Sequence, residues 1–278
     1  MPEPPLPDAP ARPLDGHKGT FGTVIVVGGC ATMPGAPAIC AGAALRAGAG
    51  LVKLATDSAT LLAALSIEPS ATGLILDGAD SIDGADAKGD AVLAIGPGFG
   101  DAHDVDRLVL DLLGGNRRIV LDADGLNALA RFGKPRPGGA PAVLTPHPGE
   151  FRRLAEAAGV DPDGTTPEAR PANGAALARH HRAVVVLKGR QTVITDGQRT
   201  ALNPTGNPAL ATAGSGDVLT GVIASLMAQG MPAFDAARLG CHVHGAAADA
   251  WAAEHGPAGL KARDLADRLP AALNPLRR

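Results

Sequence analysis

The residues best suited to chemistry lie in the segment Gly214–Asp217, Gly-Ser-Gly-Asp, which follows a Pro- and Gly-rich approach. A run of small and aliphatic residues comes next and predicts a buried helix. The two glycines allow a tight turn that brings main-chain N–H groups close to a ligand. Together with the positive end of the helix, these groups favour binding of an anion such as phosphate.

Asp217 has two interpretations. A carboxylate beside a bound phosphate would repel it, so the residue could be a helix cap that faces away from any ligand. Alternatively, it is a general base that takes a proton from a hydroxyl while the neighbouring phosphate is transferred to that hydroxyl. The Gly-Ser-Gly-Asp segment alone leaves both open.

Lys188 ends an apolar run and precedes Gly189. Its ammonium could reach a phosphate as a mobile point charge while Thr192 hydrogen-bonds the same group, or it could be a strand-end charge in water. His147 lies between two prolines, which would present the imidazole at a loop surface, although a satisfied structural histidine is the alternative. Glu150 could hold Mg²⁺ through water or cap a helix that begins there.

Two further pairs of residues are weaker candidates. Asp122 and Asp124 follow a predicted strand and could support a metal, but turn formation is favoured for this segment. His242 and His244 are two positions apart on a predicted helix and therefore face different sides, so a metal pair is not expected there.

These candidates depend on elements that alternate along the chain. Apolar, β-branched runs predict strands at 23–27, 51–55, 91–95, 119–122, 142–145, 183–187 and 192–195, and helices are expected at 35–48, 102–113, 149–158, 174–181, 218–229 and 234–254. Such alternation predicts an α/β fold with a mostly parallel sheet covered on both faces. Its ligand site lies beyond the carboxyl ends of the strands, where the loops 28–37, 96–100, 122–127, 145–151 and 188–192 would meet the turn at 214–217.

The composition narrows the class of protein. A length of 278 residues suits one α/β domain, expected at 15–278 after a flexible Pro-rich arm at 1–14. A net charge of −3 gives no sign of a nucleic-acid or membrane partner. The three cysteines lack zinc or disulfide spacing, and no signal peptide or apolar span is present, so reduced thiols and a cytoplasmic location are expected.

Several common nucleotide and hydrolase motifs are absent from the sequence. There is no GxxxxGK[ST], so a P-loop is excluded. The GPGFG segment lacks dinucleotide-binding spacing, and neither GxSxG nor HExxH occurs. Phosphate would therefore be bound by glycine loops and helix ends.

The chain resembles the ADP-dependent (S)-NAD(P)H-hydrate dehydratase family, a branch of the ribokinase-like superfamily. The resemblance runs from about Lys18 to Asp249 and rests on KGTFGTVIVVGG, PGAP, ALRAGAGLV, IGPGFG, VLDADGLNAL, VLTPHPGEF, VVLKGRQTVI and NPTGNPALATAGSGDVLTGVIASLMAQG. The GSGD segment alone indicates only the superfamily, whereas TPHPGEF with NPTGNPALATAGSGDVLTG is specific to the family. Where the family usually has GTGD, this chain has Ser215, which keeps the hydroxyl.

The resemblance implies a ribokinase-like three-layer αβα sandwich and a reaction. The substrate would be NADH or NADPH hydrate, which carries a hydroxyl on C6 of the nicotinamide ring. ADP would phosphorylate that hydroxyl, phosphate would leave with help from the ring nitrogen, and NAD(P)H and AMP would be released. Mg²⁺ is expected to neutralise phosphoryl charge. A homotetramer and a separate epimerase partner are also implied, since an epimerase domain is not expected before Lys18.

The same resemblance assigns roles to individual residues. Asp217 matches the catalytic base and also contacts substrate. The nucleotide-binding positions are Lys188, Gly189, Arg190, Gln191, Thr192, Gly214, Ser215 and Gly216. The substrate-binding positions are Ala36, His147 and the 96–100 loop, where Gly98 or Gly100 is the contact. Glu150, whose position alone suggests it, stays the candidate metal ligand, with the helix cap as its alternative.

Two other functions fit part of the sequence. An ATP-dependent kinase of the same superfamily, acting on a vitamin-precursor alcohol, would use the same Asp and anion site, but TPHPGEF disfavours it. A non-catalytic nucleotide-binding protein is disfavoured by the intact Asp217 and Lys188.

Overall fold

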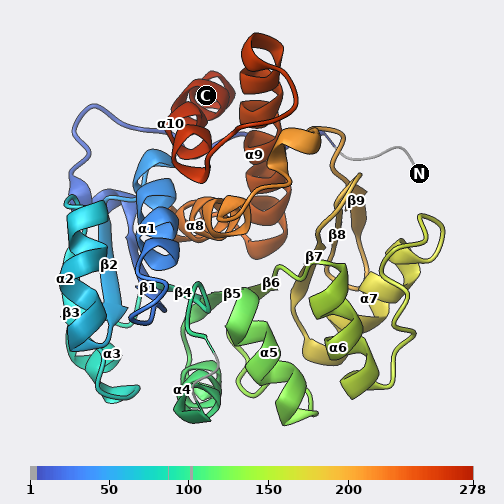
Figure 1. The fold of residues 1–278 in the computed structure, drawn as a ribbon, viewed down its shortest axis with the longest axis horizontal. Helices are drawn as coiled ribbons and strands as arrows, with labels where there is room; N and C mark the ends of the chain where they lie inside the picture. The colour runs from blue at the N-terminus through green and yellow to red at the C-terminus, as the bar shows by residue number, and fades with distance from the viewer. Residues whose placement is uncertain (1–4, 87, 101–102, 278) are drawn as a thin grey trace.

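The computed structural model describes residues 5–86, 88–100 and 103–277, and in this part of the chain nine strands form one sheet between two layers of helices (Figure 1). The strand order is β3-β2-β1-β4-β5-β6-β7-β8-β9, parallel up to β7 and antiparallel for the last two strands. The strands are β1 (Thr23–Val27), β2 (Leu51–Thr56), β3 (Thr72–Ile75), β4 (Val92–Ile95), β5 (Arg118–Leu121), β6 (Ala142–Leu144), β7 (Val184–Leu187), β8 (Val193–Thr195) and β9 (Thr200–Leu202).

Helices cover both faces of the sheet, as the α/β pattern predicted. Four of them share one hydrophobic cluster: α1 (Gly35–Arg46), α8 (Ser215–Ala228), α9 (Ala233–His255) and α10 (Ala262–Leu273). The other cluster includes residues of α3 (Asp80–Ala85), α4 (His103–Gly114), α5 (Ala123–Phe132), α6 (Pro148–Ala158) and α7 (Arg170–His181). The helix α2 (Ser58–Ile67) packs beside β2 and β3.

The apolar strands form because both of their faces are buried. In β1, Val24 and Val26 belong to the first cluster, while Ile25 and Val27 belong to the second. Successive side chains of a strand point to opposite faces, so a continuous β-branched run is required where helices cover both sides.

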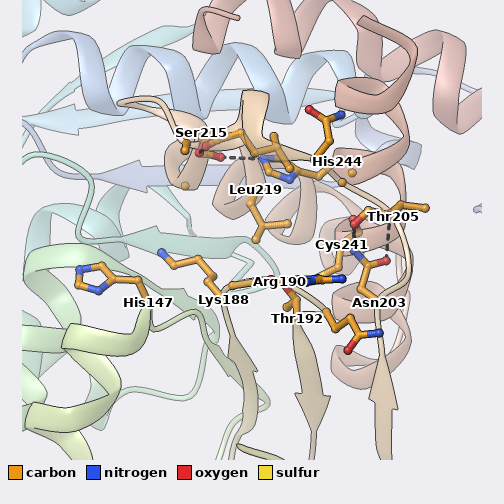
Figure 2. Close-up of a pocket in the computed structure, with 18 of the residues that line it drawn as sticks. His147, Lys188, Arg190, Thr192, Asn203, Thr205, Ser215, Leu219, Cys241 and His244 are labelled. Carbon is orange, nitrogen blue, oxygen red and sulfur yellow. Dashed lines mark hydrogen bonds between the residues drawn. The ribbon is translucent and has the colours of Figure 1, made fainter. Parts of the chain in front are cut away.

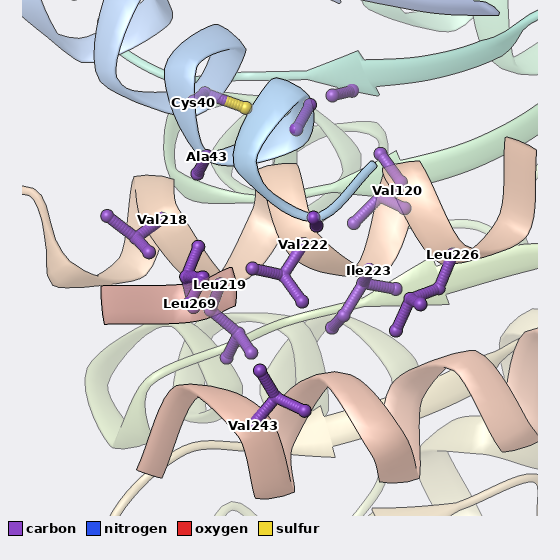
Figure 3. Close-up of a cluster of buried hydrophobic side chains, with 14 of the residues drawn as sticks. Cys40, Ala43, Val120, Val218, Leu219, Val222, Ile223, Leu226, Val243 and Leu269 are labelled. Carbon is purple, nitrogen blue, oxygen red and sulfur yellow. The ribbon is translucent and has the colours of Figure 1, made fainter. Parts of the chain in front are cut away.

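The helix that follows the Gly-Ser-Gly-Asp turn is α8, and it lies in the middle of the first cluster (Figure 3). All of its residues from Val218 to Ala228 are buried. A Cβ at Gly221 would lie 2.2 Å from the carbonyl oxygen of Cys40 in α1, so only glycine permits this approach. Small residues in α1 and α8 thus set the position of the turn relative to the sheet.

Six of the strands and α-helices in the described part of the chain were not predicted. The edge strands β3 and β9 have four and three residues and are largely exposed, so they lack a clear apolar run. The helices α2, α3, α5 and α10 were also missed. The loop expected at 122–127 is wrong for most of its length, because α5 begins at Ala123, directly after β5 and the N-cap Asp122.

The N-terminal segment contacts the end of the chain. Ala9 is buried and forms an isolated bridge with Arg277, and Arg238 donates a hydrogen bond to the carbonyl of Pro5. Within the flexible Pro-rich arm expected at 1–14, Pro5 is thus held by Arg238 of α9, and Ala9 and Pro10 are held by residues 276 and 277. Residues 1–4 of that arm, and residue 102 at the start of an expected helix, lie outside the described residues. No helix in the described part of the chain is long and apolar enough to span a membrane.

Candidate active site

The Gly-Ser-Gly-Asp segment forms the first turn of α8. Gly214 is the N-cap residue with φ of 83°, a left-handed conformation that glycine adopts without strain. No side chain of the described residues caps this helix end, so Asp217 is not the cap. The turn therefore has the conformation expected of an anion site, with the carboxylate of Asp217 left for another role.

Asp217 is half-buried in the first turn. Burial raises the pKa of its carboxyl to about 7, and the negative charge of Asp122 raises it further, while Lys188 opposes the shift. A carboxyl whose pKa lies near neutrality can accept a proton from a hydroxyl and is mostly ionised just above that pH. Its electrostatics are those of a general base.

Lys188, at the end of β7, is held by two carboxylates. Its Nζ lies 2.8 Å from Oδ1 of Asp122 and 3.8 Å from Oε2 of Glu150, and its side chain is only 20% exposed. Burial alone would lower the pKa of the ammonium, but the charges of Asp122 and Glu150 outweigh it and raise that pKa. The interpretation of Lys188 as a strand-end charge in water is wrong.

The ammonium also lies against the anion turn. The position that a Cβ would take on Gly216 is 3.3 Å from Nζ of Lys188 and 3.4 Å from Oδ2 of Asp122. Hence the positive charge of the lysine lies next to the first turn of α8.

Asp122 does more than form a turn. Its side chain is 3% exposed, and its second oxygen accepts a hydrogen bond from Thr220 of α8 at 2.9 Å. Burial would raise the pKa of this carboxyl, but Lys188 lowers it, and the hydrogen bond from Thr220 contributes. The interpretation of Asp122 as a turn residue therefore missed its contacts. Asp122 follows β5 and binds Lys188 after β7 and Thr220 in α8.

His147 and Glu150 cap α6. Nδ1 of His147 accepts hydrogen bonds from the amides of Gly149 and Glu150, and Oε2 of Glu150 accepts one from the amide of His147 at 2.8 Å. Nδ1 is thus an acceptor, and the remaining ring nitrogen, Nε2, lies 3.4 Å from Oε1 of Glu150. Burial and the nearby Lys188 lower the pKa of this imidazole. Both residues have structural roles, yet both also line the cavity.

One cavity of about 990 Å³ gathers most of the predicted site residues. Its lining includes His147, Glu150, residues 188–192 and residues 214–217, together with Asp122. Figure 2 shows His147 and Lys188 at one end, and Asn203, Thr205, Cys241 and His244 at the other. A volume of this size accommodates a nucleotide.

Three predicted residues lie outside this lining. Ala36 is near the start of α1, and a Cβ on Gly98 would approach its Cβ to 2.9 Å, so these two positions pack together. Gly98 is buried, whereas Gly100 is half-exposed and its amide donates to Asp124 at 2.8 Å. Asp124 is close enough to raise the pKa of Asp217. The loop 96–100 is thus hydrogen-bonded to Asp124, and Gly100 is the more accessible of its two candidates.

The far wall of the cavity contains His244, which the sequence analysis weighed only as a metal ligand, and Asn203, to which it gave no role. His244, on α9, makes a hydrogen bond from Nε2 to the carbonyl oxygen of Ser215 at 2.9 Å, and burial lowers its pKa to about 4. A neutral His244 thus donates to that carbonyl and holds the first turn of α8. Asn203 donates to the carbonyls of Thr205 and Cys241 and fixes the Pro- and Gly-rich approach against α9. Long-range contacts of this kind have no local sequence signal.

Comparison with known proteins places this site in a family. A family model described as NAD(P)H-hydrate dehydratase matches residues 24–271. The chain belongs to the NAD(P)H-hydrate dehydratase family. The members of this family are carbon–oxygen lyases, and the resemblance seen in the motifs is confirmed.

Individual relatives agree with the family assignment. The ADP-dependent (S)-NAD(P)H-hydrate dehydratase of Neisseria meningitidis serogroup B is 40% identical over 92% of this chain and 86% of its own. The crystal structure of the ADP/ATP-dependent NAD(P)H-hydrate dehydratase from Bacillus subtilis, co-crystallised with ATP/Mg²⁺, has a TM-score of 0.82 at 34% identity and covers 97% of this chain and 95% of that one. The chain spans about half the length of other curated relatives it matches, which are bifunctional NAD(P)H-hydrate repair enzymes.

The fold comparison confirms the predicted architecture. A ribokinase-like superfamily protein from Enterococcus faecalis has a TM-score of 0.83 at 24% identity and covers 97% of this chain and 93% of that one, which shows a common fold. The ribokinase-like three-layer αβα sandwich with a mostly parallel sheet is therefore confirmed.

Proposed function

We propose that this protein dehydrates (6S)-NAD(P)H hydrate to NAD(P)H with ADP as phosphoryl donor, releasing AMP and phosphate. The observation that carries the proposal is the position of Asp217. Its half-buried carboxyl, with a pKa of about 7, lies in the helix turn that forms the anion site. The proposed base and the proposed anion site thus lie in the same helix turn, as phosphorylation of a hydroxyl requires.

The reaction follows from this arrangement. Asp217 accepts the proton of the C6 hydroxyl. The hydroxyl oxygen forms a bond to the β-phosphorus of ADP while the bond between that phosphorus and the oxygen of AMP breaks. The amides of Gly214–Gly216 and the ammonium of Lys188 stabilise the charge on the transferred group. The C6–O bond then breaks and phosphate leaves with the bonding electron pair. The lone pair of the ring nitrogen forms an iminium with C6, and loss of the C5 proton to solvent restores the dihydronicotinamide.

The nucleotide and the hydrate would occupy neighbouring parts of the site. The loop 188–192 and the turn 214–216 line the cavity and supply main-chain amides and Lys188 to the phosphates. His147 lies at the end of the cavity toward α6, and the amide of Gly100 donates to Asp124, whose negative charge acts on Asp217. Ala36, His147 and Gly100 are therefore the proposed contacts to the nicotinamide hydrate, with Gly98 supporting the loop.

The donor set fits Mg²⁺ held chiefly by phosphates. Among the described residues, no three His, Cys, Asp or Glu side chains form a ready metal cage. Mg²⁺ commonly retains water and uses one or two carboxylates plus substrate phosphates, and Glu150 offers such a carboxylate to the cavity. When bound, the ion would neutralise charge on the nucleotide phosphates.

Assembly and cellular context are proposed from the family. A homotetramer in the cytoplasm is expected. A separate epimerase would supply the reactive epimer, and this proposal agrees with the bifunctional repair enzymes among the relatives.

The test is an absorbance assay at the reduced-nicotinamide band with purified protein, NADH or NADPH hydrate, Mg²⁺, and ADP or ATP. Growth of the band with ADP, matched by AMP release, is the expected result. Growth only with ATP would overturn ADP as the donor. No growth with either would overturn the dehydratase proposal and favour a kinase that acts on a small alcohol.

A further inference from the structure

Arg170 is a buried cation that the proposed chemistry does not use. It is the first residue of α7, and its side chain lies beneath the loop 188–192, with the residue only 6% exposed. No carboxylate among the described residues forms a salt bridge with it, and burial lowers the pKa of its guanidinium. A buried charge without a counter-ion is costly, so its position requires another explanation.

The guanidinium forms hydrogen bonds to main-chain carbonyl oxygens. Nη2 donates to the carbonyl oxygens of Leu187 at 2.8 Å and Lys188 at 3.2 Å, and Nη1 donates to that of Arg190 at 2.6 Å and approaches that of Gln191 at 3.4 Å. Two planar nitrogens thus hold four carbonyls, a geometry for which the arginine fork is suited.

The remaining carbonyls of the segment have partners as well. The carbonyl of Gly189 accepts from the hydroxyl of Thr192 at 3.0 Å, and that of Thr192 accepts from the amide of Asn203 at 2.9 Å. Every carbonyl from residue 187 to residue 192 is therefore turned toward a protein donor and away from a bound anion.

The amides of the loop are left for a ligand. Within the described part of the chain, the amides of Gly189, Arg190 and Gln191 make no hydrogen bond to protein. Gly189 and Gln191 have φ of 138° and 53°, the unusual left-handed conformations that a tight amide-presenting loop adopts. Successive free amides in such a loop form a concave anion site.

We propose that Arg170 is a positioning residue, which holds the loop 188–192 so that its free amides face the nucleotide phosphates. This inference rests on the proposed function, since the ligand is the nucleoside diphosphate of that reaction. Arg170 acts through the loop and touches neither the nucleotide nor the hydrate. Its effect is to arrange the loop before ADP arrives, which reduces the ordering that binding requires.

The chain offers a matched control at the other end of α7. Arg136 is 1% exposed, donates to the carbonyls of Pro137, Ala140 and Arg182, and like Arg170 has a buried Nε without a partner among the described residues. Its amide donates a hydrogen bond to the ring of His181, the last residue of α7, which lies about 16 Å along the helix from Arg170. Arg136→Ala removes a similar buried guanidinium far from the cavity.

The experiment is calorimetric titration of the full chain with ADP and Mg²⁺ for wild type, Arg170→Ala, Arg170→Lys and Arg136→Ala, with unfolding temperature recorded for each. Arg170→Ala is expected to weaken ADP binding by about 10- to 100-fold. Arg170→Lys should weaken it by a smaller factor, because an ammonium keeps some of the carbonyl contacts that alanine loses. Arg136→Ala is expected to lower the unfolding temperature and leave ADP affinity within about twofold. If Arg170→Ala does not fold, the ADP affinity of Arg170→Lys is compared with that of Arg136→Ala, and the inference requires the weaker binding in Arg170→Lys.

Turnover separates positioning from general damage. With NADH hydrate, KM for ADP should rise in the Arg170 variants while kcat at saturating ADP stays within a few-fold of wild type. Unchanged ADP affinity in the folded Arg170 variants, or an equal loss in Arg136→Ala, would overturn the inference. Wild type that binds ADP without turning over the hydrate would overturn the proposed function alone, whereas wild type that binds neither ADP nor ATP would overturn both.

Discussion

Replacing Asp217 with Asn should change activity and stability in opposite directions. The amide keeps the shape of the side chain but cannot accept the proton, so kcat should fall by about 10²- to 10⁴-fold with ADP affinity nearly unchanged. The same substitution removes a carboxylate that is partly desolvated in the folded protein. The variant should therefore be more stable than wild type wherever Asp217 is ionised.

The size and sign of this gain follow from the raised pKa. The carboxyl has an ordinary value of 3.8 and titrates at about 7 in the folded protein, an interval worth at most about 4 kcal/mol. Solvent reaches this half-buried group, so about 1–2 kcal/mol is the expected gain. Between these pH values the folded protein holds a proton that the unfolded chain has lost. Stability from the protonated group is thus complete below about pH 4 and lost as the pH rises through 7.

Urea unfolding of wild type and Asp217→Asn at pH 5 and pH 8, without nucleotide, measures the effect. The free energy of unfolding of the variant should exceed that of wild type at pH 8 and approach it at pH 5. An equal difference at both pH values would refute the raised pKa. Turnover within a few-fold of wild type would refute the assignment of Asp217 as the base.

Three other substitutions test the surroundings of the site. Lys188→Ala should weaken ADP binding in calorimetry. It also leaves Asp122 buried without its counter-charge, so the free energy of unfolding should fall by about 3–5 kcal/mol, and adding Asp122→Asn should recover part of this loss. Asp122→Asn alone removes a negative charge near the base, so the acid limb of the kcat/KM profile should move from about pH 7 to lower pH, and an unmoved limb would contradict the coupling. Gly221→Ala should lower the free energy of unfolding in urea by about 1–3 kcal/mol, because the added methyl group meets the carbonyl of Cys40. Gly84→Ala, whose methyl group meets open space, should not destabilise the protein, and equal effects of the two substitutions would refute the packing argument.

The strands and the glycine turn before α8 were predictable because their signals are local. Continuous β-branched runs such as Thr23–Val27 indicate strands buried on both faces, and a glycine turn before an aliphatic run indicates a helix start. Short edge strands carry little of this signal, which is why β3 and β9 were missed.

The interpretation of Asp122 shows where local signals end. Its segment has the composition of a turn, but α5 begins directly after it and Lys188, 66 residues away, supplies the counter-charge. Only the strand order brings β5 and β7 close enough for this pair, and that order is not readable from spacing. Arg170 was missed, and His244 was weighed only as a metal ligand, for the same reason: Arg170 contacts the carbonyl of Leu187 and His244 that of Ser215, both distant in sequence.

The central claim is that the C6 hydroxyl oxygen leaves as phosphate. Hydrate labelled with ¹⁸O at this hydroxyl, converted by the purified protein with ADP and Mg²⁺, gives a direct measurement by mass spectrometry of the products. The label should appear in the released phosphate, at one labelled oxygen per NADH formed. Recovery of the label in water, with unlabelled phosphate, would show that ADP cleavage and dehydration are separate steps and would contradict the proposed reaction.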